Sequence, residues 1–181
     1  MSVLAVFGGS FDPPHVAHVL VACWARTAGG VDRVLVVPTY QHAFGKQSVA
    51  YEDRREMARL AFADLPFVTI DDTERTLGGE SRTFHTLNAL AEAYPDDTFR
   101  LVIGADILAD TDRWYRWDEV ARLAPPLVVG RGGYPLPPEC PLEMPEVSST
   151  ELRADIAAGR SIAGRVPRPV LEYIEARGLY R

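Results

Sequence analysis

Two histidines three residues apart, His15 and His18, are the side chains in this sequence best placed for chemistry. They follow the glycine pair Gly8 and Gly9 and two prolines, and they stand at the start of a helical pattern over residues 16–27. Residues i and i+3 share a helix face, and the first turn of a helix offers unpaired N–H groups and partial positive charge. The combination predicts a phosphate site. A metal site formed by the two histidines and an α/β turn without a ligand are the alternatives.

The elements expected around this turn alternate between strand and helix. Apolar runs predict strands at residues 3–7, 33–37, 67–70, 99–103 and 127–129, and helical periodicity predicts helices at 16–27, 51–63 and 83–94. Because no hairpin signals separate the strands, the order predicts an α/β fold. We expect a Rossmann-like doubly wound parallel sheet of about five strands, with an irregular proline-rich loop over 131–147 and a small helical C-terminal unit. Ligands bind such sheets at the carboxyl ends of the strands.

Composition favours a small enzyme of one domain. The chain has 181 residues, 47% of them hydrophobic, which predicts a single domain over 1–181 with a helical subdomain at 148–181. A net charge of −6 argues against a general nucleic-acid binder. The absence of a long apolar stretch and of a signal peptide predicts a cytoplasmic protein without a membrane partner. Cys23 and Cys140 fit no metal spacing or disulfide framework. We expect Cys23 to be a core residue and Cys140 to have a free thiol.

A second glycine turn follows the strand predicted at 99–103. Gly104, Ala105 and Asp106 come directly after it. An aspartate at the end of a strand can accept hydrogen bonds from a ribose hydroxyl. Alternatively, Asp106 caps the helix that follows.

A third segment, Ser148 to Arg153, opens a helix. Ser148 and Glu151 have the spacing of a capping box. The hydroxyl groups and N–H groups at the mouth of this helix also suit a phosphate, to which Arg153 adds charged donors. An ordinary helix cap is the alternative.

These segments together resemble one enzyme family. Residues 8–18 resemble the GxFDPxHxGH signature of the nucleotidyltransferase superfamily of adenylyltransferases, with Ala17 where the family usually has glycine. Residues 103–106, continued by Trp114, resemble the IGxDxL…W region of bacterial nicotinate-mononucleotide adenylyltransferases, and residues 147–153 resemble their ISSTxIR motif. The resemblance extends through the closing VPxxVxxYIxxxxLY pattern and covers nearly the whole chain.

The resemblance implies a nucleotidyltransferase that moves AMP from ATP to nicotinate mononucleotide, giving deamido-NAD and pyrophosphate, with Mg²⁺ bound through the nucleotide phosphates. The implied catalytic residues are His15, His18, Lys46 and Arg153. The implied ATP-binding residues are Gly8, Gly9, Ser10, Phe11, Gly104, Asp106, Ser148, Ser149 and Thr150. The implied acceptor-binding residues are Thr83, Thr86, Trp114 and Arg131.

Other functions stay open at this point. The acceptor could be nicotinamide mononucleotide or phosphopantetheine. A non-catalytic nucleotide-binding module of the same fold is a further alternative, supported by Ala17 and by His85, which replaces the family's aspartate. Trp117 competes with Trp114 as the stacking residue, and either could be a core anchor. The expected partners are the small molecules ATP and the acceptor. The sequence does not decide whether the protein is a monomer or a homo-oligomer.

Overall fold

One parallel sheet positions the predicted site. The computed structural model describes residues 1–41, 48–108, 110–135 and 143–181, without the side chains of Asp112 and Arg131. Within these residues the strands lie in the order β3-β2-β1-β4-β5-β6, and every pair of neighbours is parallel. The strands are β1 (Val3–Gly9), β2 (Arg33–Pro38), β3 (Val68–Ile70), β4 (Thr98–Gly104), β5 (Pro126–Arg131) and β6 (Glu143–Met144).

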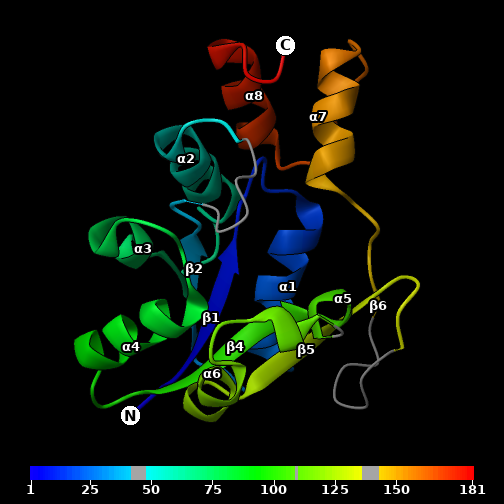
Figure 1. Cartoon of the computed structure of the whole chain (residues 1–181). Helices are drawn as coiled ribbons and strands as arrows, with labels where there is room; N and C mark the ends of the chain where they lie inside the picture. Colours follow the sequence, from blue (N-terminus) through cyan, green and yellow to red (C-terminus); the bar gives the residue numbers. More distant parts are fainter. Residues whose placement is uncertain (42–47, 109, 136–142) are drawn as a thin grey trace.

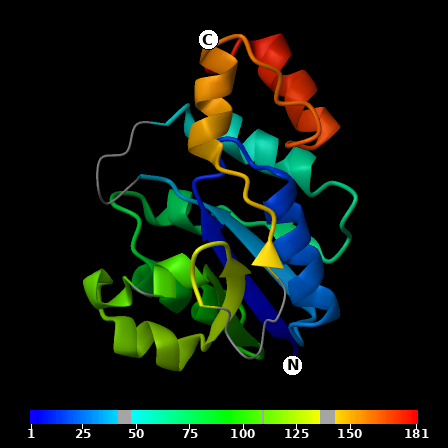
Figure 2. The same ribbon diagram turned by 90° about the vertical axis from the view of Figure 1, so that its right-hand side faces the viewer.

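Helices connect the strands and cover both faces of the sheet (Figures 1 and 2). They are α1 (Val16–Thr27), α2 (Tyr51–Ala61), α3 (Thr73–Leu77), α4 (Thr83–Ala93), α5 (Ala105–Leu108), α6 (Trp117–Leu123), α7 (Ser149–Ala157) and α8 (Arg168–Arg177), with a 3₁₀ turn at Thr111–Arg113. Figure 1 shows α7 and α8 beyond the carboxyl end of β1, on the side of the molecule opposite the N-terminus. This pair of helices therefore stands over the edge at which ligands bind parallel sheets.

Strand residues alternate between two hydrophobic clusters. In β1, Ala5 and Phe7 pack with α1 and α2, whereas Leu4 and Val6 pack with α4 and α6. Strand residues point to opposite faces in turn, so a sheet that is covered on both faces must be apolar at consecutive positions. All four of these side chains are at most 9% exposed. This double burial explains why the strands read as continuous apolar runs.

The structure confirms the predicted α/β class and the five predicted strands. It adds the short strand β6 inside the segment expected to be irregular, and it adds α3, α5 and α6, which the periodicity had not indicated. These helices have four to seven residues, too few to display a clear period. Cys23 is only partly buried in α1 and lies outside the core clusters, whereas Cys140 lies outside the described residues.

Among the described residues, no helix is long and apolar enough to cross a membrane.

Candidate active site

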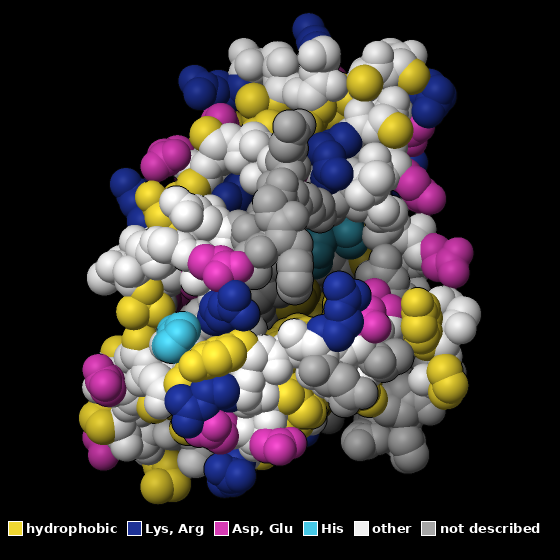
Figure 3. Space-filling view, in the orientation of Figure 1, with side chains coloured by type: hydrophobic (Ala, Val, Ile, Leu, Met, Phe, Trp, Pro, Cys, Tyr) yellow, Lys and Arg dark blue, Asp and Glu magenta, His cyan; other side chains and the backbone are white. Residues whose placement is uncertain are grey.

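The site lies where the strand order reverses. Strands β1 and β4 are neighbours, but their connections run to opposite sides of the sheet, toward β2 and β5. The chain leaves β1 at Gly9 and β4 at Gly104, so both predicted glycine segments open at this switch point. Figure 3 shows histidine side chains in a hollow of this face, with Lys or Arg side chains on its rim.

The chain turns after the glycine pair and not at it. Strand β1 continues through Gly8 and Gly9, and the turn comes at Phe11, whose φ is +48°, followed by a cis Asp12–Pro13 bond. The left-handed conformation thus falls on Phe11, two residues after Gly9, and not on either glycine. Phe11 is 1% exposed and its ring folds back, so that a Cβ on Gly9 would lie 3.2 Å from it. A side chain at position 9 would force the Phe11 ring to shift by a few tenths of an ångström. Because Phe11 is buried, any contact of this residue with a nucleotide has to come from its backbone.

His15 and His18 form one unit at the N-terminus of α1. Their ring centroids are 3.8 Å apart with an interplanar angle of 29°, and the ring of Phe11 packs against His18 at 5.0 Å. The main-chain N–H of His15, the N-cap residue, donates to Nδ1 of His18 over 3.1 Å. Since Nδ1 accepts this bond, the proton of a neutral His18 ring is on Nε2. Nε2–H is then a hydrogen-bond donor beside the helix N-terminus.

The stacked rings also bear on the alternative of a metal site. A metal ion lies close to the plane of each imidazole that binds it, at about 2.0–2.1 Å from the nitrogen. Two stacked rings with an interplanar angle of 29° lie in nearly parallel planes, so one metal ion at bonding distance could not lie close to both planes. Among the described residues, no group of three or more His, Cys, Asp or Glu side chains could hold a metal ion. The stacked arrangement of His15 and His18 therefore does not suit one metal ion bound by both rings.

Helix α7 is attached directly to the loop that follows β1. The Ser149 hydroxyl donates to the carbonyl of Pro13 over 3.0 Å, and Nη1 of Arg153 donates to the carbonyl of Asp12 over 2.7 Å. Nη2 of Arg153 reaches Oγ1 of Thr150 over 3.3 Å. The bonds from Ser149 and Arg153 to the loop join segments more than 130 residues apart and bring the N-termini of α1 and α7 to the same loop. The arginine side chain stays 24% exposed.

The start predicted for α7 is confirmed, but the predicted capping box is not. Ser148 is the N-cap residue, yet its side chain makes no capping bond in the described structure. The hydroxyl one residue later, on Ser149, bonds to the neighbouring loop instead. Tertiary contact with the loop after β1 has thus replaced the local cap that the sequence suggested.

Arg54 is a site residue that the sequence did not indicate. Its side chain is 2% exposed in α2 and donates to the carbonyls of Ser10 (2.9 Å), Val49 (3.1 Å) and Tyr40 (3.4 Å). Burial lowers the pKa of its guanidinium, and the negative charge of Asp12 partly opposes that shift. Arg54 therefore holds the loop after β1 and the segment after β2 together. In the sequence it stands in a charged run typical of a solvated helix face.

Asp106 lies at the second glycine turn, at the start of α5. Its carboxylate folds over Gly104 so closely that any side chain at that position would clash with Oδ1. A side chain at position 104 would therefore force the carboxylate of Asp106 to move. Asp106 is partly buried at the carboxyl end of β4, where a ribose would bind in a doubly wound sheet.

The residues predicted to bind the acceptor are more scattered. Thr83 is the first residue of α4, and Trp114 packs edge-to-face on Trp117 with ring centroids 5.6 Å apart. Thr86 is 3% exposed, and its hydroxyl bonds to Oε1 of Glu74 and to the carbonyl of Arg82, each over 3.3 Å. Its hydroxyl is therefore occupied by structural bonds.

Two predicted residues, Lys46 and the side chain of Arg131, lie outside the described part of the chain.

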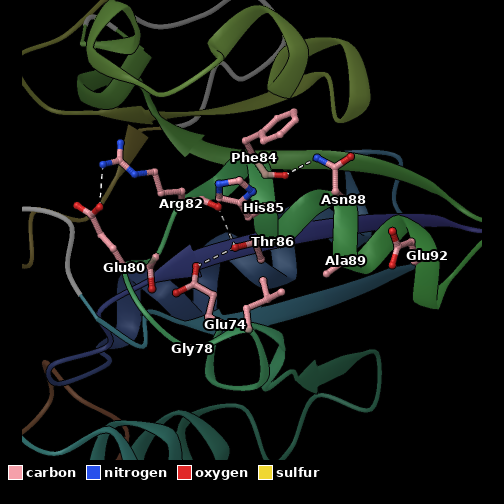
Figure 4. A pocket seen from close by; sticks show the side chains of 12 residues that line it. Glu74, Gly78, Glu80, Arg82, Phe84, His85, Thr86, Asn88, Ala89 and Glu92 are labelled. Carbon is pink, nitrogen blue, oxygen red and sulfur yellow. Dashed lines mark hydrogen bonds and ion pairs between the residues drawn. The ribbon is translucent and has the colours of Figure 1, made fainter.

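A pocket of about 410 Å³ lies between the α3–α4 connection and the outer face of α4 (Figure 4). Its floor contains Thr86 and Glu74, whose side chains point toward each other. Burial raises the pKa of Glu74, and hydrogen bonds from Ser81, from the Tyr40 N–H and from Thr86 act against this rise. Glu74, which the sequence did not single out, thus ties the end of β2 to α3 and α4. The pocket's lining includes neither His15 nor His18.

The fold is of the doubly wound α/β class, and the histidine pair lies at its switch point, where such folds bind nucleotides. The chain belongs to the cytidylyltransferase-like family, whose pattern matches residues 6–155.

Its relatives agree with the resemblance predicted from the sequence. A "probable nicotinate-nucleotide adenylyltransferase" of Anaeromyxobacter sp. strain K is 48% identical over 98% of this chain and 96% of its own length. A protein of the same name from Thermus thermophilus is 39% identical over 98% of this chain and 99% of its own length. The Plasmodium falciparum nicotinic acid mononucleotide adenylyltransferase complexed with NaAD has the same fold, with a TM-score of 0.85, 19% identity, and coverage of 99% of this chain and 98% of that one.

Proposed function

We propose that this protein transfers the AMP unit of MgATP to nicotinate mononucleotide, forming deamido-NAD and pyrophosphate. The observation that carries the proposal is the stacked pair His15 and His18 at the mouth of α1, with Arg153 held against the same loop. The names of the nearly full-length relatives support the choice of reaction.

The chemistry requires alignment and charge stabilisation. An oxygen of the acceptor phosphate attacks the α-phosphorus of ATP, and the bond from that phosphorus to the β-phosphate oxygen breaks. The acceptor phosphate is already a nucleophile, so no general base is needed. The protein has to hold both reactants in line and to stabilise the charge that develops on the phosphate oxygens. Mg²⁺ enters with ATP, bound to its phosphates, and reduces the repulsion between them.

Each part of the site has a role in this proposal. The Nε2–H of His18, His15 and the N–H groups at the start of α1 stabilise the α- and β-phosphates. Arg153 and Lys46 hold the leaving pyrophosphate, together with the hydroxyl groups and N–H groups at the start of α7. Asp106 accepts hydrogen bonds from the ribose of ATP. Thr83, Trp114 and Arg131 surround the nicotinate ring. Thr86, whose hydroxyl is bonded to Glu74 and Arg82, shapes the pocket around that ring.

Pyrophosphate release tests the proposal. The protein is mixed with MgATP and, in parallel, with nicotinate mononucleotide, nicotinamide mononucleotide or phosphopantetheine. We expect release with nicotinate mononucleotide and formation of deamido-NAD in equal amount. Faster release with another acceptor would reassign the substrate. ATP binding without release with any acceptor would support a non-catalytic nucleotide-binding protein instead.

A further inference from the structure

A tyrosine beyond α8 is bonded to the loop that carries the histidines. The hydroxyl of Tyr180 donates to Oδ1 of Asp12 over 2.7 Å, across 168 positions of sequence, and lies 3.9 Å from Sδ of Met57. Asp12 is fully buried. Tyr180 has a φ of +66°, a left-handed backbone conformation that L-residues other than glycine rarely adopt. Its contacts therefore hold it in a conformation that the chain would not choose by itself.

Asp12 connects this tyrosine to the proposed catalytic groups. Its carbonyl accepts the 2.7 Å bond from Nη1 of Arg153, and its Oδ2 lies 3.6 Å from the same nitrogen. Three residues further along the chain, His15 begins the stacked pair. The position of Asp12 thus affects both the arginine and the histidines.

The carboxylate of Asp12 can be satisfied in two ways. With Tyr180 donating to Oδ1, Arg153 donates to the main-chain carbonyl of Asp12, and its side chain stays partly exposed. Without the phenolic donor, the buried carboxylate would lose a charge-assisted hydrogen bond. The nearest cation able to replace that bond is Arg153, which would then turn toward the carboxylate and away from the site.

We propose that Tyr180 is a positioning residue for phosphate chemistry, which acts by satisfying Asp12 so that Arg153 remains available to the leaving pyrophosphate. The proposal rests on the function proposed above. It assigns to Tyr180 no contact with substrate. Its effect is transmitted through one carboxylate to one guanidinium.

A second tyrosine of the C-terminal unit provides a matched control. Tyr173 in α8 donates to Oδ1 of Asp53 over 2.8 Å, so Tyr173→Phe removes the same kind of tyrosine–aspartate bond. That bond joins α8 to α2 and does not involve the loop after β1. Tyr180→Phe and Tyr173→Phe should both lower the urea midpoint of unfolding. If Tyr180 acts only through stability, the two variants will also behave alike in catalysis.

The experiment compares these variants by pyrophosphate release under single-turnover conditions and by calorimetric binding of MgATP and of pyrophosphate. We expect Tyr180→Phe to lower the rate and to weaken pyrophosphate binding, each about tenfold, as the loss of a charge-assisted bond would do. Tyr173→Phe should change neither by more than about twofold. In an Arg153→Ala background, Tyr180→Phe should have less than about a twofold further effect, because the residue through which it acts is gone.

Two outcomes would overturn the positioning role. One is equal loss in Tyr180→Phe and Tyr173→Phe, and the other is a full tenfold effect of Tyr180→Phe in the absence of Arg153. The proposed function fails in a different way, through a wild-type protein that releases no pyrophosphate with any acceptor. The calorimetric comparison of the variants does not depend on turnover, so it tests the role of Tyr180 in that case also.

Discussion

The main-chain N–H of His15 donates to Nδ1 of His18, so one imidazole closes the first turn of α1, and in the neutral ring the proton is on Nε2. In the proposed function, Nδ1 of His18 stabilises the helix start and Nε2–H binds phosphate, and substitutions can distinguish these two roles. An asparagine places an oxygen near the position of Nδ1 but has nothing at the position of Nε2. An alanine removes both.

We predict that His18→Ala and His18→Asn both lower kcat, on the order of 10²-fold, because each loses the Nε2–H donor to the phosphates. His18→Ala should also lose about 1 kcal/mol of stability, as expected for loss of a helix cap, whereas His18→Asn should retain most of it. Steady-state kinetics and urea unfolding measure the two effects. Near-full turnover of a folded His18→Asn would remove the ring from the mechanism, and His15→Ala tests its partner in the same way.

Removal of metal ions distinguishes a phosphate site at His15 and His18 from a zinc site. Because the rings of His15 and His18 are stacked, we expect protein treated with a chelator to regain full activity with Mg²⁺ and ATP, and zinc to be dispensable. Elemental analysis of the purified protein should find no stoichiometric zinc. Activity that only zinc restores would establish the metal alternative.

Arg54 should be essential for stability despite its place in a charged run. Arg54→Met leaves the carbonyls of Ser10, Val49 and Tyr40 without their donor, and we expect a loss of about 2–3 kcal/mol in the free energy of unfolding. Activity should fall as well, since two of these carbonyls lie on loops at the site. Arg59, exposed on the same helix, is the control, and Arg59→Met should leave the unfolding midpoint almost unchanged. Similar midpoints for both variants would contradict the role of Arg54.

The contrast between Arg54 and the elements around it shows what the sequence can predict. Residues 16–27 display a clear helical pattern, and β1 and β2 read as strands because both of their faces are buried. Arg54 escapes prediction because its burial depends on carbonyls from three other positions. The bond from Tyr180 to Asp12 crosses 168 residues, and no local pattern marks it. The motif residues could be named in advance, whereas the contacts that hold them required the fold.

Asp72 should contribute to a loss of the free energy of unfolding in acid. The guanidinium of Arg55 and the hydroxyl of Tyr51 hydrogen-bond to this carboxylate and hold its pKa below the ordinary value of 3.8. A depressed pKa means that the unfolded chain binds the proton first, so the stabilisation is present above about pH 4 and is lost as the pH falls through the folded-state pKa. Asp72→Asn should be less stable at pH 7 and should lose less stability between pH 5 and pH 3. Parallel pH profiles of urea unfolding would exclude this contribution.

The preference for nicotinate mononucleotide over nicotinamide mononucleotide depends on the side chains and N–H groups around Trp114. Nicotinate carries a carboxylate, whereas nicotinamide carries a neutral amide. If the acceptor pocket offers N–H donors and no unpaired hydrogen-bond acceptor, it favours the acid. A site built for one polar group rejects a mismatched analogue strongly, because its buried donors are then left unpaired. We therefore expect kcat/KM for nicotinate mononucleotide to exceed that for nicotinamide mononucleotide by at least about 10²-fold.

Trp114 itself should affect the acceptor more than ATP. Its ring is partly buried and packs edge-to-face with Trp117. In the proposed function, a face of this ring is the surface on which the pyridine stacks. Trp114→Ala should raise KM for the acceptor more than KM for ATP, and Trp114→Phe should recover part of the loss because it restores an aromatic face. Trp117→Phe is the control for disturbed packing, and it should change both KM values to a similar, small extent. Equal use of the two acceptors, or a Trp114→Ala penalty that falls mainly on ATP, would move the acceptor pocket away from this tryptophan.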